Sequence, residues 1–255
     1  MKIPDFNQAP LLVIWEVTRA CALACRHCRA SAEDWRDPRE LTTEEGFRLI
    51  DQICAFGETP PLLVLTGGDP MRRPDLAELV RYSSSKRMTV ALTPSGTAAA
   101  TRARLRELKD AGLSRVAVSL DGPDAPTHDA FRGVRGSFDW TMRIIRFAIE
   151  CGLSLQINTT MSRRTLPFIE AMARRVREFP IALWAVFFLV RTGRGASLDQ
   201  VTPEQCEDVL TYLYHLSLTA PFGIKTTEAP HFHRVIRQGE HELANHHVLT
   251  SENHS

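Results

Sequence analysis

Residues 11–28, LLVIWEVTRACALACRHC, join an apolar run to a loop that carries three cysteines. Leu11 to Val17 has the length and the apolar, β-branched composition of a buried strand. The loop then continues to a helix that opens at Thr42, where Thr42 and Glu45 have capping-box spacing, and that ends at Gly57. This stretch therefore predicts a unit made of a strand, a long loop and a helix.

The same unit recurs along the chain, and the recurrence predicts the fold class. Five further apolar runs are each followed by a segment with helical periodicity: Pro61–Thr66, Met88–Thr93, Arg115–Leu120, Leu153–Thr159 and Ile181–Val190. Alternation of this kind is typical of α/β folds with parallel strands. Six successive units fit an open doubly wound sheet or a partial barrel, and periodicity alone does not choose between them. A short β-like stretch, Gly223 to Thr227, follows the sixth unit.

Composition and charge limit the classes of protein to which the chain can belong. The chain has 255 residues, of which 44% are hydrophobic and 24% charged, so we expect one large domain with a core. The 31 Lys and Arg residues nearly balance 30 Asp and Glu residues, which predicts neither a nucleic-acid partner nor a membrane partner. The start does not resemble a secretory signal, and no run approaches the ~20 apolar residues of a spanning helix. We expect a soluble, cytoplasmic protein.

The cysteines predict a metal site. Cys21, Cys25 and Cys28 lie within eight residues, whereas Cys54, Cys151 and Cys206 are scattered over predicted helices, where we expect buried apolar roles. This is not the pattern of a secreted disulfide framework. Three thiolates leave one metal position open for a substrate or cofactor. Two alternatives stay open, namely a zinc site with His27 as the fourth ligand and cysteines that only pack.

Other unusual residues follow the next three strands, at the edge where the cysteine loop is also expected. These segments are Gly67-Gly68-Asp69-Pro70, Pro94-Ser95-Gly96-Thr97 and Ser119-Leu120-Asp121-Gly122. Paired glycines let backbone carbonyls approach a ligand ammonium closely, and Asp69 adds a complementary charge, although an ordinary turn has the same composition. Asp121 suits a ribose hydroxyl and also suits a helix cap. The convergence predicts an active site at the carboxyl ends of the strands.

With these motifs in place, the sequence resembles the radical S-adenosylmethionine (SAM) superfamily, whose CxxxCxxC hallmark matches Cys21, Cys25 and Cys28. The resemblance implies a partial (β/α)6 TIM-like barrel and three cysteines that ligate three irons of a [4Fe–4S] cluster. The fourth iron would chelate SAM, and reductive cleavage of SAM would lead to hydrogen abstraction from a substrate. The resemblance also implies cofactor contacts, with no residue assigned to catalysis itself, at Gly67, Gly68, Asp69, Pro70, Ser95, Ser119, Asp121 and Asn158.

The resemblance is to the SPASM-type branch near the haem- and peptide-modifying enzymes, without the C-terminal extension. It covers about residues 10–235, including Arg191 to Gly195 and Lys225 to Arg234. We expect a core domain of residues 1–235 and a disordered or truncated tail of residues 236–255. It implies a peptide or tetrapyrrole substrate and a flavodoxin- or ferredoxin-type electron donor. The alternatives are a non-catalytic iron–sulfur or zinc module, and a truncated enzyme that lacks its substrate or auxiliary-cluster domain.

Overall fold

A single parallel sheet organises the computed structural model, in which residues 6–241 are described. Its strands are β1 (Leu12–Thr18), β2 (Leu62–Gly67), β3 (Val90–Leu92), β4 (Leu113–Ser119), β5 (Ser154–Met161), β6 (Leu183–Phe188) and β7 (Gly223–Thr227). They lie in sequence order from β1 to β7, and every neighbouring pair is parallel. The prediction of an α/β fold with parallel strands is confirmed, and the β-like stretch at 223–227 forms a seventh strand beside β6.

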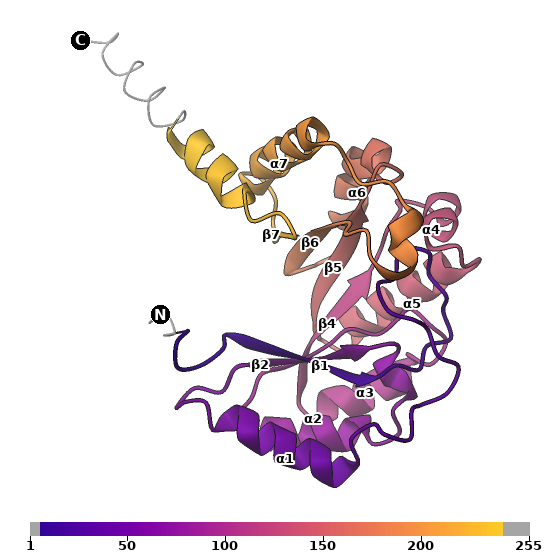
Figure 1. Ribbon diagram of the computed structural model, residues 1–255, viewed down its shortest axis with the longest axis vertical. Helices are drawn as coiled ribbons and strands as arrows, with labels where there is room; N and C mark the ends of the chain where they lie inside the picture. The colour runs from indigo at the N-terminus through magenta and orange to yellow at the C-terminus, as the bar shows by residue number, and fades with distance from the viewer. Residues whose placement is uncertain (1–5, 242–255) are drawn as a thin grey trace.

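The strand order separates the two architectures that the sequence left open. A doubly wound sheet reverses its strand order at a switch point, which sends helices to both faces. Here the order never reverses, so right-handed crossovers place the connecting helices on one face and leave the other face concave. Figure 1 shows this arrangement, with α1, α2, α3 and α5 outside the curved sheet. The fold is therefore an open, partial barrel.

Local sequence signals explain most of the helices. The helices are α1 (Thr43–Cys54), α2 (Leu76–Ser85), α3 (Arg102–Asp110), α4 (Ala125–Arg132), α5 (Ser137–Glu150), α6 (Ile169–Val176) and α7 (Pro203–Ser217), with 3₁₀ turns η1 (Pro70–Arg72), η2 (Leu166–Phe168) and η3 (Gly193–Ser197). Thr42 forms the expected capping box with Glu45 at α1. Helix α4 was not predicted, because its eight residues are capped by Asp124 but lack an apolar period.

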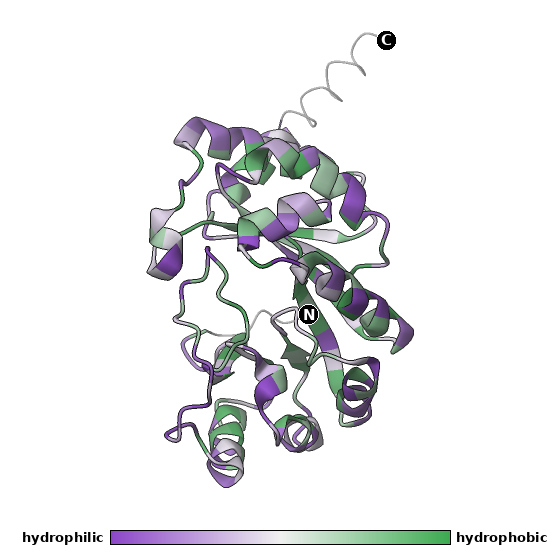
Figure 2. Cartoon of the chain, turned by 90° about the vertical axis from the view of Figure 1, so that its right-hand side faces the viewer, coloured by the Kyte–Doolittle hydropathy of each residue, from purple (hydrophilic) through white to green (hydrophobic). Residues whose placement is uncertain are grey.

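The core lies between the sheet and the outer helices. Along β5, Leu155, Ile157 and Met161 are buried toward the helices, whereas Gln156 and Asn158 alternate with them on the concave face. Trp184 of β6 is fully buried, and its indole nitrogen donates to Thr159 Oγ1 at 2.9 Å. Figure 2 shows the same division, with hydrophobic strands inside and mixed colours along the outer helices. Polar groups on the concave face thus remain available to ligands.

The C-terminal part of the described chain extends beyond the predicted end of the core at residue 235. Residues 232–241 are helical, Val235 is buried, and Ile236 packs against the main apolar core. The remaining tail, residues 242–255, lies outside the described residues. Within residues 6–241, no helix has both the length and the apolar character required to span a bilayer.

Candidate functional site

The three clustered cysteines line one cavity at the carboxyl ends of the first four strands. This open cavity has a volume of about 150 Å³, and its walls come from the loop after β1 and the ends of β2, β3 and β4, with Arg132 and Arg194 added from later segments. Cys21 and Cys25 are buried and Cys28 is partly exposed. The cavity residues used below are Cys21, Cys25, His27, Cys28, Gly67, Gly68, Ser95, Ser119, Arg132 and Arg194. The predicted convergence at one edge of the sheet is what the structure shows.

Backbone hydrogen bonds fix the cysteine loop, which we define as residues 19–33. The amide of Cys21 donates to the Glu33 carbonyl at 2.9 Å, and the amide of Cys28 donates to the Cys25 carbonyl at 3.2 Å. Burial raises the pKa of the Cys25 thiol, although the nearby Arg132 acts in the opposite direction. The Cys25 thiol is therefore protonated near neutral pH, and a metal that binds it must displace a proton.

The double glycine brings the end of β2 against the start of the cysteine loop. The amide of Gly68 donates to the Thr18 carbonyl at 2.7 Å, and the amide of Asp69 donates to the Ala20 carbonyl at 2.7 Å. A Cβ on Gly68 would lie 2.5 Å from the Ala20 oxygen, and Gly67 has a φ of +130°. Any side chain at Gly68 would displace the loop. Both glycines also line the cavity, as the sequence predicted.

Asp69 does not line the cavity, and its predicted contact with the cofactor stays a prediction. It is buried, with 1% of its surface exposed. It accepts from Thr97 Oγ1 at 2.6 Å and from the Met71 amide at 3.2 Å. Asp69 therefore joins two turns, while Pro70, also buried, begins η1. Ser95 does line the cavity, and its hydroxyl donates to the Gly68 carbonyl.

The segment after β4 separates two residues that were predicted to contact the cofactor together. Ser119 lines the cavity, whereas Asp121 is 1% exposed and lies next to the cavity residues Arg132 and His27. Asp121 Oδ1 accepts from the Thr160 amide at 2.8 Å, and the expected ribose contact of this residue stays a prediction. Strand β4 ends at Ser119, and the strand alternation used in the prediction no longer applies at Asp121. Asn158 accepts from Gln156 Nε2 at 2.7 Å on the concave face, outside the cavity lining.

A buried charged cluster around Asp121 was missed by the sequence analysis. Asp121 Oδ2 lies 3.5 Å from Arg132 Nε and 4.0 Å from His27 Nε2, and the Asp121 amide donates to His128 Nδ1 at 3.0 Å. Burial alone would raise the pKa of Asp121, but His27 and Arg132 together lower it. Burial lowers the pKa of His27, and it lowers the pKa of His128 to about 4. Asp121 and His27 each had a sequence signal of their own, but no spacing rule connected them to His128 or Arg132.

The arrangement fits an iron–sulfur cluster better than a single metal ion. His27 stacks on Phe131 with ring centroids 4.7 Å apart and turns Nε2 toward Asp121, which leaves Nδ1 as its only nitrogen for a metal. Throughout residues 6–241, no three His, Cys, Asp or Glu side chains lie close enough to share one ion. A [4Fe–4S] cluster takes one thiolate per iron, which spreads its ligands apart. Arg132 pairs through Nε with Asp121, and its Nη1, buried and without a hydrogen-bond partner in the described chain, suits an anionic group in this cavity.

The other three cysteines lie outside this site. Cys54, Cys151 and Cys206 are partly buried and pack against the main core, close to the apolar role that was predicted. Cys206 has an additional contact, since its Sγ lies 3.3 Å from His231 Nε2.

Comparisons with known proteins agree with this geometry. A sequence model of the Radical SAM superfamily matches residues 15–167. An AdoMet-dependent heme synthase of Oleidesulfovibrio alaskensis is 42% identical over 238 residues, which cover 92% of this chain and 61% of that protein. A PqqA peptide cyclase of Bradyrhizobium diazoefficiens is 33% identical over 62% of this chain and 40% of its own length.

The fold is also shared with solved structures. Streptococcus suis SuiB bound to S-adenosylmethionine superposes with a TM-score of 0.72 at 17% identity, over 86% of this chain and 51% of that protein. The chain thus spans less than two thirds of the length of these relatives.

Proposed function

The chain belongs to the radical SAM superfamily, and from that premise we propose that it modifies a carboxylate side chain of a tetrapyrrole. The observation that carries the proposal is the single cavity that joins Cys21, Cys25 and Cys28 to the ends of β2, β3 and β4. When bound there, a [4Fe–4S] cluster and SAM supply a reactive carbon radical that abstracts hydrogen from a substrate. The cysteine loop holds the cluster, and Gly67, Gly68 and Ser119 form walls against which SAM would lie.

The relatives favour a tetrapyrrole over a peptide as the substrate. Relatives that are 39–42% identical to this chain are named AdoMet-dependent heme synthases. A further relative that is 37% identical is named Fe-coproporphyrin III synthase. The relatives named as peptide cyclase and mycofactocin maturase match at 32–33% identity. A peptide substrate is therefore the second candidate.

The concave face offers a cation for such a substrate. Ile224 of β7 packs against the core, so the alternation of the strand places Lys225 on the concave face. Four residues in register form a row across the sheet, from Lys225 on β7 through Ala185 on β6 and Asn158 on β5 to Ser119 on β4. Ser119 lies at the cavity. Three strand spacings make this row about 14 Å long. Lys225 is exposed, and no carboxylate in the described chain forms an ion pair with it.

We therefore propose that Lys225 pairs with a substrate carboxylate while another part of the same molecule reaches the cavity. A charge-assisted pair between an ammonium and a carboxylate fixes orientation as well as adding affinity. Gln156 and Asn158, which are hydrogen-bonded to each other beside this row, provide further polar contacts. A small flavodoxin- or ferredoxin-type protein is the proposed electron donor.

The test combines binding with turnover under anaerobic conditions. Iron coproporphyrin III should bind to the reconstituted chain, as followed by its Soret absorbance, and should stimulate dithionite-driven release of 5′-deoxyadenosine from SAM. Lys225→Gln should weaken binding about tenfold, as loss of a charge-assisted hydrogen bond predicts. Lys109→Gln is the matched control, because Lys109 bonds the Gly152 carbonyl on the helical side of the molecule.

The possible results separate the candidate functions. Stimulation by a peptide and not by the porphyrin would support the second candidate. Cleavage of SAM with binding of neither substrate would indicate that the substrate site needs a further domain. A chain that binds zinc and cleaves no SAM would refute radical chemistry altogether.

A further inference from the structure

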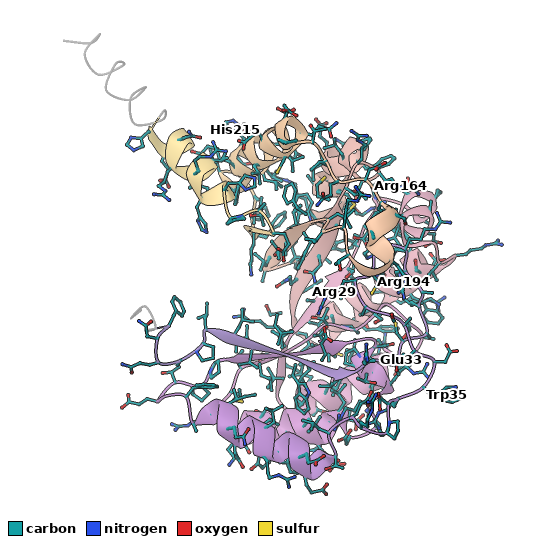
Figure 3. The ribbon with its side chains drawn as sticks, in the orientation of Figure 1. Arg29, Glu33, Trp35, Arg164, Arg194 and His215 are labelled. Carbon is teal, nitrogen blue, oxygen red and sulfur yellow. The ribbon has the colours of Figure 1, made fainter. Side chains whose placement is uncertain are left out.

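The segment after β6 reaches back across the fold and bonds to the cysteine loop. This η3 segment, residues 191–197, contains the Arg-Thr-Gly-Arg-Gly motif. The amide of Arg194 donates to the Cys28 carbonyl at 3.0 Å, and its side-chain Nε donates to the Cys25 carbonyl at 2.9 Å. Figure 3 shows Arg194 and Arg29 on the same side of the sheet, from the segments that follow β6 and β1. Arg194 thus contacts the backbone of two predicted cluster ligands.

The glycine of this motif permits the close approach. Gly193 has a φ of +54°, and a Cβ on it would lie 2.1 Å from the carbonyl oxygen of Arg29. No other residue satisfies both the backbone conformation and the distance. The η3 segment therefore packs directly on the cysteine loop, with the Arg194 side chain directed along it.

Helix α4 holds the same loop from a different element. The amide of Arg26 donates to the Arg132 carbonyl at 3.0 Å, and His27 stacks on Phe131. Phe131 belongs to a small apolar cluster with Leu189 and Leu198, which flank the η3 segment. The cysteine loop is thus bonded to two elements that also pack on each other.

No carboxylate of the described chain neutralises the charge of Arg194 beside the cavity. Arg194 lines the cavity, and no carboxylate of the described chain lies within ion-pair distance of its guanidinium. A cation in a site of low dielectric stabilises nearby thiolates and an anionic cluster. The net charge and hydrogen bonds around an iron–sulfur cluster also tune its reduction potential.

We propose that Arg194 is a positioning residue for the cluster. Its hydrogen bonds to the Cys25 and Cys28 backbone hold the ligand loop, and its charge favours the reduced state of the cluster. The inference rests on the proposed function, because it takes the three cysteines as cluster ligands.

The test uses anaerobically reconstituted chain and two readouts other than activity. The first is the rate at which iron is lost to a chelator, and the second is the midpoint potential from an EPR-monitored redox titration. Arg194→Ala should lose iron at least tenfold faster. Arg194→Gln should lower the ratio of reduced to oxidised cluster about tenfold at a fixed potential, which corresponds to 59 mV for one electron. Arg194→Lys keeps the charge and should keep the potential, while losing iron faster than the wild type.

Arg164→Gln is the control, because Arg164 is an exposed cation after β5 and contacts none of the cysteines through a hydrogen bond in the described chain. It should match the wild type in both readouts. Wild-type rates and potential in Arg194→Ala would overturn the inference, and equal potentials in the Lys and Gln variants would overturn the role of the charge. If Arg194→Ala fails to fold, the Lys and Gln variants still decide both points. A wild-type chain that takes up no cluster would instead refute the proposed function, and this inference with it.

Discussion

The buried His128 should make the stability of the fold depend on pH between 7.5 and 5. His128 is fully buried, and its Nδ1 accepts the Asp121 amide, so the ring is neutral in the folded protein. Burial lowers its pKa to about 4 from an ordinary value of 6.5. Because the unfolded chain binds a proton that the folded chain excludes, stability is full above pH 6.5 and falls as the pH drops toward 4.

The size of this effect follows from the two pKa values. At pH 5 an unfolded histidine is almost fully protonated, whereas folded His128 is mostly neutral. At 1.36 kcal/mol per pKa unit, the transfer from pH 7.5 to 5 costs about 2 kcal/mol. Asp121, with its lowered pKa, contributes stability that is lost only as the pH falls below about 4. The lowered pKa of His27 also makes the fold less stable at low pH. His27 is present in both the wild type and His128→Asn, so its effect cancels when the two are compared.

The assay is urea unfolding of the metal-free wild type and of His128→Asn at both pH values. Asparagine keeps an acceptor for the Asp121 amide but does not titrate, so the wild type should lose about 2 kcal/mol more than this variant on acidification. His215→Asn is the control, since His215 is exposed near the end of α7 (Figure 3), and it should behave as the wild type. Equal losses in the wild type and His128→Asn would refute the buried, neutral histidine.

Three further changes test the site. Cys25→Ala should abolish both the cluster and SAM cleavage, measured by iron analysis and release of 5′-deoxyadenosine; cleavage without a cluster would contradict the mechanism. Gly68→Ala should lower iron uptake, because its Cβ would lie 2.5 Å from the Ala20 oxygen, whereas Gly57→Ala meets its nearest atom at 3.6 Å and should load normally. Asp69→Ala should cost about 1–3 kcal/mol of stability, since it leaves the Thr97 hydroxyl and the Met71 amide unpaired. The Asp69→Ala variant should also bind SAM more weakly, because the turns beside the cavity are disturbed, and it should retain its iron. Unchanged thermal stability would contradict the structural role of Asp69.

Periodicity predicted much of the fold because the signals were local. The first six strands were apolar runs, and the start of α1 followed from the capping box of Thr42 and Glu45. The choice between a doubly wound sheet and a barrel depends on strand order, which periodicity does not encode. Helix α4 escaped prediction because two of its three buried residues, His128 and Arg132, are polar and only Phe131 is apolar.

The sequence predicted those residues of the candidate site whose position follows from the ends of the strands. Cys21, Gly67 and Ser119 line the cavity because the carboxyl ends of parallel strands meet there. The directions of side chains beyond a strand end are set by tertiary contacts, which is why Asp69 and Asp121 proved to be buried. The cavity residues Arg132 and Arg194 come from segments far along the chain, and no spacing rule connects them to the cysteines.

The most direct test of the account is anaerobic iron and sulfide analysis of the reconstituted chain, with electronic spectra recorded before and after addition of SAM. The account predicts about four irons and four sulfides per chain and a spectrum that changes when SAM binds to the open iron. Zinc in place of iron, or a four-iron cluster whose spectrum is indifferent to saturating SAM, would contradict it.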